Sequence, residues 1–196
     1  MLKLGILGGT FDPIHMAHLA VAEQARTQLG LEQVLFIPAW LAPHKKGNTR
    51  AADRAADRVA MLRLALQDNP AFILDESEIH RRGTSYTVET LRRLHERMAS
   101  AAHLHLLIGA DNYAIFHRWR EPEEILRLAT PVVYPRMNVP LATVAPPFRV
   151  LEGPTFELHA TWIRAAVARG QSIRYLVPER VREYIAAHHL YRLPEE

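Results

Sequence analysis

The 196-residue sequence contains no cysteine, so it can form no disulfide, no thiolate nucleophile and no zinc–thiolate site. It also lacks an apolar run long enough to cross a bilayer, and residues 1–5 lack the apolar core of a signal peptide. These absences lead us to expect a soluble protein of the cytoplasm that has no contact with a membrane.

A dense basic segment is also missing. The 24 Lys and Arg residues outnumber the 21 Asp and Glu residues only slightly, giving a net charge of +3, and they are scattered along the chain. We therefore do not expect nucleic acid as a partner. Arginine outnumbers lysine, which suits an enzyme that handles small phosphates, because guanidinium groups bind phosphate oxygens in pairs.

Short apolar runs alternate with segments of helical periodicity. The expected strands are residues 2–7, 34–38, 72–74, 104–108, 131–134 and 155–158. The expected helices are residues 16–29, 52–67, 87–98, 111–117, one from about 121, 161–169 and 178–188, while 38–49 and 137–150 are expected loops. This alternation predicts an α/β fold: a Rossmann-like, doubly wound parallel sheet with helices on both faces. We expect one domain over residues 1–196, with a small C-terminal helical part over about 159–196.

The first expected strand ends in Gly8 and Gly9, directly before a helix that begins near His15 and His18. In such folds ligands bind at the carboxyl ends of the strands, so the loops after Leu7, Pro38 and Ile108 are the candidate site. Glycines allow a ligand to approach the backbone, and a helix N-terminus directs unpaired N–H groups at it, so the segment predicts an anion site.

His15 and His18 are three positions apart and share one face of the helix. The segment contains neither the G-x-G-x-x-G pattern nor a P-loop. Zinc is a poor alternative because Asp12 is the only nearby carboxylate in the motif. Two capping or surface histidines would be a further alternative.

The stretch "GGTFDPIHMAH" resembles the H-x-G-H signature of the nucleotidyltransferase superfamily. The whole chain resembles one branch, the bacterial nicotinate-nucleotide adenylyltransferases. The further matching blocks are "APHK" at 42–45, "RVAMLRLA" at 58–65, "ESEIHRRGTSYTVETL" at 76–91, "LIGADNYAIFHRW" at 107–119, "TWIR" at 161–164 and "VPERVREYIAAHHLY" at 177–191.

The resemblance implies transfer of an adenylyl group from ATP to nicotinate mononucleotide, giving nicotinate adenine dinucleotide and pyrophosphate. The attacking phosphate monoester has a second pKa of about 6 and is already a nucleophile at neutral pH, so catalysis would consist of positioning and charge stabilisation. Three alternatives stay open: the amide mononucleotide, another phosphomonoester, and a non-catalytic nucleotide-binding protein. The sequence also leaves a homo-oligomer open.

The resemblance also implies the site residues. Catalysis would fall to His15, His18 and Arg164. ATP would be bound by Gly8, Gly9, Thr10, Phe11, His18, Gly109, Asp111, Thr161, Ile163 and Arg164. The mononucleotide would be bound by His44, Lys45, Ser85, Tyr86, Thr87 and Trp119. Mg²⁺ is expected on the ATP phosphates and water, with no metal ligand from the protein.

Simpler roles remain for three of these residues. Lys45 could be a solvated loop lysine, Asp111 an N-cap, and Trp119 a core residue. Among the other histidines, His103 and His105 are expected on one face of a strand near its exposed end, without a chemical role, and His95, His188 and His189 on solvated helix faces.

The chain departs from the family pattern at two places. Ala17 stands where the family usually has glycine, and His159 and Ala160 stand where it is usually serine-rich. We expect the His159 ring to replace a serine hydroxyl toward the triphosphate, which would make ATP affinity sensitive to pH between about 6 and 7. The alternative is a partly buried His159 packed near Trp162.

Overall fold

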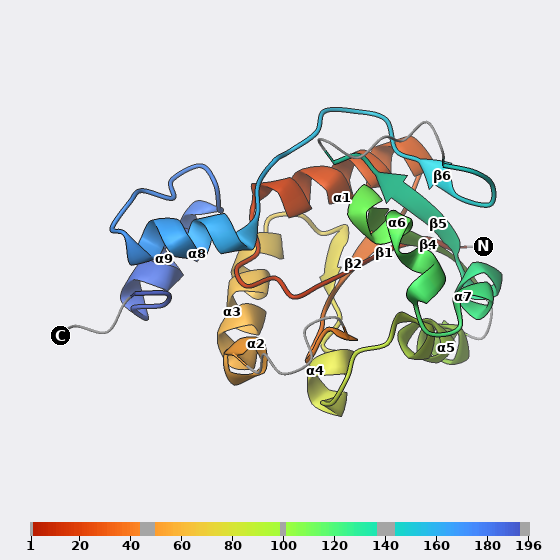
Figure 1. Cartoon of the computed structure of the whole chain (residues 1–196), viewed down its shortest axis with the longest axis horizontal. Helices are drawn as coiled ribbons and strands as arrows, with labels where there is room; N and C mark the ends of the chain where they lie inside the picture. Colours follow the sequence, from red (N-terminus) through yellow and green to blue (C-terminus); the bar gives the residue numbers. More distant parts are fainter. Residues whose placement is uncertain (1, 44–49, 99–100, 137–143, 193–196) are drawn as a thin grey trace.

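The computed structural model describes residues 2–43, 50–98, 101–136 and 144–192. Within these residues six strands form one sheet in the order β3-β2-β1-β4-β5-β6 (Figure 1). They are β1 (Leu2–Gly9), β2 (Gln33–Pro38), β3 (Phe72–Leu74), β4 (Ala102–Gly109), β5 (Thr130–Tyr134) and β6 (Arg149–Val150). Every neighbouring pair is parallel, which confirms the predicted Rossmann-like α/β fold. The strand order reverses between β1 and β4, and this reversal places the crevice of the fold there.

Helices connect the strands. They are α1 (Met16–Leu29), α2 (Arg50–Asp53), α3 (Ala55–Leu66), α4 (Ser77–Arg81), α5 (Thr87–Met98), α6 (Ala110–Ala114), the 3₁₀ helix η2 (Phe116–Arg118), α7 (Pro122–Leu128), α8 (Ala160–Ala168) and α9 (Glu179–Ala187). The bounds of α1, β3 and α5 agree with those expected from periodicity. The two C-terminal helices lie beside α3, at the left of Figure 1.

Two apolar cores flank the sheet because successive side chains of a strand point to opposite faces. In β2, Phe36 joins the core under α1, α3 and the C-terminal helices, while Leu35 and Ile37 join the core under α5 and α7. Both faces of the central strands are therefore buried, as a parallel sheet requires.

The expected strand at 155–158 is wrong. The sixth strand is the exposed two-residue β6, which lies inside the segment expected to be a loop and pairs with Val132 and Val133 of β5. Two residues at a sheet edge carry no periodicity, so tertiary pairing decides the strand. The apolar Leu158 packs against the core from a segment without strand structure.

Two expected helices are interrupted. The segment 52–67 is divided at Arg54 into α2 and α3, and the segment 111–117 is divided at Ile115 into α6 and η2. The short helix α4 was not expected. Apart from α3, each of these pieces has five residues or fewer and is too short to show a helical period, so contacts with the rest of the fold define their ends.

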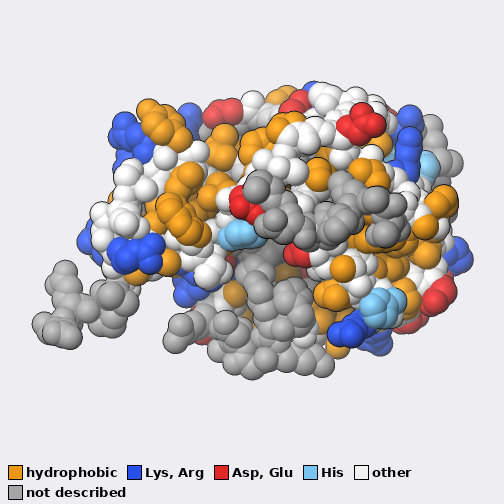
Figure 2. Space-filling model, turned by 45° about the horizontal axis from the view of Figure 1, so that its top comes forward, with side chains coloured by type: hydrophobic (Ala, Val, Ile, Leu, Met, Phe, Trp, Pro, Cys, Tyr) orange, Lys and Arg blue, Asp and Glu red, His pale blue; other side chains and the backbone are white. Residues whose placement is uncertain are grey.

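The face shown in Figure 2 carries dispersed basic and acidic side chains among apolar and polar ones, rather than one continuous basic patch. None of the described helices is long and apolar enough to cross a membrane.

His95 and His105 are more buried than expected. His95 is half-buried, with Nε2 2.6 Å from the carbonyl oxygen of Leu128. His105 is only 3% exposed, and its Nδ1 has no hydrogen-bond partner among the described residues. The His103 ring lies 4.5 Å from it on the same face of β4 and is exposed. Burial, with added repulsion from His103 and Arg149, lowers the pKa of His105 from 6.5 to about 4.

We expect His105 to make the fold less stable in acid. Its pKa is lower in the folded chain than in the unfolded chain, so the unfolded state binds more protons between pH 6.5 and 4 and stability falls as the pH falls. This group alone should cost about 2 kcal/mol of unfolding free energy between pH 7 and pH 5. Urea unfolding at both pH values should show that loss in the wild type and lack it in His105→Leu.

The matched control is His103→Gln, which removes the exposed ring of the pair. It should keep most of the pH dependence. An equal loss of stability in the wild type and in His105→Leu would contradict the prediction.

Candidate functional site

A cleft with a volume of about 1560 Å³ opens at the carboxyl ends of β1 and β4. Ligand pockets for one small molecule usually measure about 300–1,000 Å³, so this cleft has room for two nucleotides. The residues expected at the site that line it are Gly8, Gly9, Thr10, Phe11, His15, His18, Ser85, Tyr86, Thr87, Gly109, Trp119, Thr161 and Arg164. The fold thus brings together residues that are more than 150 positions apart in the chain.

Two residues expected at the site do not line the cleft, and two others lie outside the described residues. The Ile163 side chain is fully buried in the core under α8. The exposed Asp111 carboxylate folds back over Gly109, and α6 has Gly109 as its N-cap, so the capping alternative for Asp111 is wrong. His44 and Lys45 lie outside the described residues.

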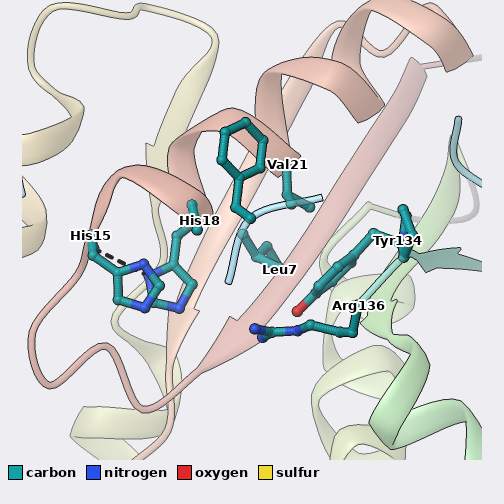
Figure 3. Close-up of a pocket in the computed structure, with 9 residues that line it drawn as sticks. Leu7, His15, His18, Val21, Tyr134 and Arg136 are labelled. Carbon is teal, nitrogen blue, oxygen red and sulfur yellow. Dashed lines mark hydrogen bonds between the residues drawn. The ribbon is translucent and has the colours of Figure 1, made fainter. Parts of the chain in front are cut away.

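The two motif histidines are stacked at the N-terminus of α1. His15 is the N-cap, and its backbone N–H donates a hydrogen bond to Nδ1 of His18 at 3.2 Å. The ring centroids are 3.6 Å apart and the rings are inclined by 21° (Figure 3). Because Nδ1 of His18 accepts this bond, the uncharged ring carries its proton on Nε2. His18 can therefore donate a hydrogen bond from Nε2.

Both imidazoles are uncharged at neutral pH. Burial, with repulsion from Arg136 and His159, lowers the pKa of His15 from 6.5 to about 3. Burial, His15 and Arg136 hold the pKa of His18 well below 6.5. Tyr134 ends β5 and Arg136 lies just after it, and Figure 3 shows the side chains of both pointing toward the two rings. A bound polyanion would raise both pKa values by replacing repulsion with attraction.

Two polar atoms of this pocket have no partner among the described residues. They are the buried Nδ1 of His15 and the buried Nε of Arg136. Buried polar atoms are normally bonded, so unpaired ones beside a cleft indicate a place for a polar ligand. No sequence pattern indicated Arg136, because its approach to the histidines depends on the pairing of β5 with β4.

The glycine-rich loop turns over a buried aromatic ring. Phe11 has φ of 50°, a left-handed conformation, and its ring lies edge-on to His18 with centroids 4.9 Å apart. A Cβ at Gly9 would lie 3.0 Å from the Phe11 ring, whereas a Cβ at Gly8 would meet nothing within 4 Å. A side chain at position 9 would thus crowd the Phe11 ring, while Gly8 leaves open space in the cleft for a ligand.

The side chain of Arg58 stabilises this loop by hydrogen bonds. Its side chain is fully buried, and its Nη1 donates to the carbonyl oxygens of Thr10 at 2.7 Å and Ala39 at 2.8 Å. Its Nε donates to the carbonyl oxygen of Ala51 at 2.7 Å. One guanidinium thus joins the loops after β1 and β2 to α2. The helical period of 52–67 placed this residue on a helix and gave no sign of its contacts.

Two further arginines hold the loop at Asp12. Arg54 forms an ion pair with the Asp12 carboxylate at 2.6 Å. Arg164, on α8, donates from Nη1 to the Asp12 carbonyl oxygen at 2.7 Å and from Nη2 to Thr161 Oγ1 at 3.2 Å. The expected residues Thr161 and Arg164 therefore lie at the same end of the cleft as the first loop.

The other end of the cleft is built around Tyr86, Thr87 and Trp119. The guanidinium of Arg120 lies 4.7 Å from the centroid of the Tyr86 ring and donates to Glu89 at 2.8 Å. Trp119 is half-buried and lines the cleft, with its ring 5.3 Å from that of Phe116. An aromatic and cationic surface of this kind suits a flat, negatively charged ring.

Ser85 lines the cleft but is almost fully buried and is bonded to the protein itself. Its side chain is buried, its Oγ accepts the backbone N–H of Trp40 at 3.0 Å, and its own N–H donates to the Leu41 carbonyl at 2.9 Å. The buried Glu78 carboxylate beside it accepts a hydrogen bond from the Thr90 hydroxyl, and burial raises the pKa of Glu78. Ser85 therefore joins the loop after β2 to the segment before α5.

His159 is exposed, lines the cleft and is the N-cap residue of α8, but its side chain makes no capping bond. The alternative of a partly buried His159 is therefore wrong. His159 and the stacked pair line the same cleft.

Comparison with known proteins agrees with this arrangement. A model of the cytidylyltransferase-like family matches residues 6–166. A protein of Roseiflexus sp. strain RS-1, described as a probable nicotinate-nucleotide adenylyltransferase, is 46% identical over 198 residues, covering 96% of this chain and 98% of that protein. A protein of Thermomicrobium roseum with the same description is 44% identical over 204 residues, covering 100% of this chain and 94% of that protein.

A solved structure has the same fold. The nicotinic acid mononucleotide adenylyltransferase of Plasmodium falciparum, complexed with NaAD, superposes with a TM-score of 0.81 at 16% identity, covering 97% of this chain and 98% of that chain. At this identity the likeness shows the fold alone.

We expect both imidazoles to stay uncharged down to low pH in the ligand-free protein. Nitrogen NMR should show His18 as the Nε2–H tautomer at pH 7, because Nδ1 accepts the backbone bond. The His15 ring should titrate at about pH 3 and the His18 ring well below 6.5. Adding inorganic triphosphate should raise both pKa values. Titration of either ring near pH 6.5 in the free protein would contradict the structure.

Proposed function

This chain belongs to the nicotinate-nucleotide adenylyltransferases of the cytidylyltransferase-like family, and on that premise we propose that it transfers the adenylyl group of ATP to nicotinate mononucleotide. The products are nicotinate adenine dinucleotide and pyrophosphate. One observation carries the assignment of the chemistry: two stacked, uncharged imidazoles at a helix N-terminus border an open glycine loop in a cleft that can hold both substrates.

The nucleophile needs no base. A phosphate monoester with a second pKa of about 6 is mostly a dianion at neutral pH. One of its oxygens forms a bond to the α-phosphorus of ATP while the bond from that phosphorus to the bridging oxygen breaks, and the electron pair leaves with pyrophosphate. His18, whose Nε2 carries a proton in the neutral ring, acts as a hydrogen-bond donor to the α-phosphate.

The electrostatic work is shared among neutral and charged donors. Arg136 beside the histidines and Arg164 on α8 would offset the charge of the triphosphate. The stacked rings donate without adding two positive charges 3.6 Å apart in the empty site. Since these groups are held in place before substrate binds, little reorganisation is needed when charge develops on the leaving group.

Magnesium would enter this cleft bound to the phosphates of ATP. The Asp12 carboxylate is paired with Arg54, and Glu78 is buried against Thr90, so neither is available as a ligand. Across residues 2–43, 50–98, 101–136 and 144–192 no cluster of three or more His, Asp or Glu side chains could hold a metal. ATP phosphates and water would carry the Mg²⁺, which would supply charge neutralisation.

The mononucleotide would occupy the end of the cleft near Tyr86, Thr87 and Trp119, with Trp119 as the face for the pyridine ring. The Ser85 N–H is already bonded to Leu41, so the backbone N–H groups of Tyr86 and Thr87 and the Arg120 guanidinium would meet the carboxylate of the ring. His44 and Lys45 remain predicted contacts of its phosphate. Asp111 remains a predicted contact of a ribose, and His159 a predicted contact of the triphosphate.

Loss of either motif histidine should remove most turnover. In an assay of pyrophosphate release with ATP, Mg²⁺ and nicotinate mononucleotide, His15→Ala and His18→Gln should each lower kcat by about 10²–10³-fold, the usual effect of removing one donor to a transition-state anion. His18→Gln keeps a side-chain acceptor for the capping bond at the start of α1, which separates chemistry from stability.

The control is His117→Gln, since His117 is exposed and does not line the cleft. It should leave kcat within about twofold of the wild type. Full turnover in His18→Gln, or no wild-type pyrophosphate release with either the acid or the amide mononucleotide, would refute the proposed function.

Arg120 should contribute to the choice of acid over amide. Replacing this half-exposed cation by glutamine should lower the ratio of kcat/KM for nicotinate mononucleotide to that for the amide by about three- to tenfold, since a partly solvated charge contributes about 1 kcal/mol. Arg127→Gln is the control, because Arg127 pairs with Glu124 outside the cleft. An unchanged ratio in Arg120→Gln would assign the selectivity to backbone donors alone.

A further inference from the structure

The last described turn of the chain reaches back to the first loop. The hydroxyl of Tyr191 donates a 2.7 Å hydrogen bond to Oδ1 of Asp12, 179 positions earlier in the sequence. The same carboxylate accepts 3.2 Å and 2.6 Å bonds from Nε and Nη2 of Arg54. Asp12 is only 4% exposed, so these donors replace water around a buried charge.

The bonds from Arg54 and Tyr191 keep the Asp12 carboxylate charged in a cleft that is proposed to bind the triphosphate of ATP. Burial acts to raise the pKa of Asp12, but the bonds from Arg54 and Tyr191, with the charge of Arg164, hold it below its ordinary value. Burial and Asp12 raise the pKa of Tyr191, so its hydroxyl stays protonated and donates. The Arg54 guanidinium also lies 5.3 Å from the centre of the Tyr191 ring.

The backbone around these groups is strained in the manner of a positioned site. Phe11, next to Asp12, has φ of 50°, and Tyr191 has φ of 64°, both in the left-handed region that is unfavourable for a residue with a side chain. Such conformations persist only where surrounding contacts enforce them. Here the Asp12 carboxylate and the Asp12 carbonyl, bound by Arg164 at 2.7 Å, are both held.

We propose that Tyr191 is a positioning residue for the phosphate subsite: through Asp12 it sets the first loop and Arg164 against the triphosphate of ATP. The C-terminal segment would thus take part in ATP binding without being a catalytic group. This inference rests on the proposed function, because it assumes that ATP phosphates occupy this end of the cleft.

The chain supplies a matched control. Tyr184, on α9, also donates its hydroxyl to a carboxylate on the neighbouring helix segment, Oδ1 of Asp57 at 2.9 Å. Neither Tyr184 nor Asp57 lines the cleft. Tyr184→Phe and Tyr191→Phe thus remove the same kind of bond between the C-terminal segment and the body of the protein, and only Tyr191→Phe touches the loop.

Steady-state kinetics on the full chain should separate positioning from general stability. Tyr191→Phe should lower kcat/KM for ATP by about 10- to 100-fold, the effect of losing a hydrogen bond to a charged group. Much of this should be a higher KM for ATP, with KM for nicotinate mononucleotide unchanged. A variant that is merely less folded would show a lower kcat with unchanged KM values. In Tyr184→Phe, kcat and both KM values should stay within about twofold of the wild type.

A double-mutant cycle completes the test. If Tyr191 acts through Asp12, then Tyr191→Phe should have little further effect on KM for ATP in an Asp12→Asn background. Three results would overturn the inference: wild-type kinetics in Tyr191→Phe, equal losses in both tyrosine variants, or additive effects in the cycle. If the wild-type protein turns over its substrates in these assays, the proposed function still holds. A wild type without turnover would refute the proposed function instead.

Discussion

The hydrogen bond from the backbone of His15 to Nδ1 of His18 controls the chemistry of the cleft. It closes the first turn of α1, fixes the tautomer of His18 and brings the two rings into a stack at 3.6 Å. A stack of two imidazolium ions at that distance would be strongly repelled, so the geometry and the lowered pKa values belong together. The two uncharged imidazoles would therefore donate hydrogen bonds to a bound anion, and the charge of that anion would raise their pKa values.

The loop that carries these rings is held by cations rather than by regular secondary structure. Arg58 binds carbonyl oxygens on two loops, Arg54 binds the Asp12 carboxylate, and Arg164 binds the Asp12 carbonyl. Burying guanidinium groups is costly, and each is stabilised here by carbonyl or carboxylate oxygens. The same groups bring positive charge close to the place where phosphates are proposed to bind, so support of the loop and binding of the ligand share one set of residues.

The division of the cleft follows from the sheet. Strand order reverses between β1 and β4, which opens a crevice with the helix N-terminus of α1 on one side and the segment after β4 on the other. The end near α8 is rich in arginine and suits phosphates, and the end near Trp119 is aromatic and suits a planar ring. Two substrates could thus approach each other across the histidine pair, as an in-line transfer requires.

The alternation of apolar runs and helical periods was enough to predict the parallel α/β sheet and the bounds of α1, β3 and α5, while the anion site expected at the glycine–histidine segment stays a prediction. These features are local, because side-chain period and turn residues are properties of neighbouring positions. Tertiary structure alone decided the pairing of β6, the burial of Ile163, and the contacts of Arg58 and Arg136. Each of these depends on which distant segments meet, and no local pattern records the partner of a buried charge.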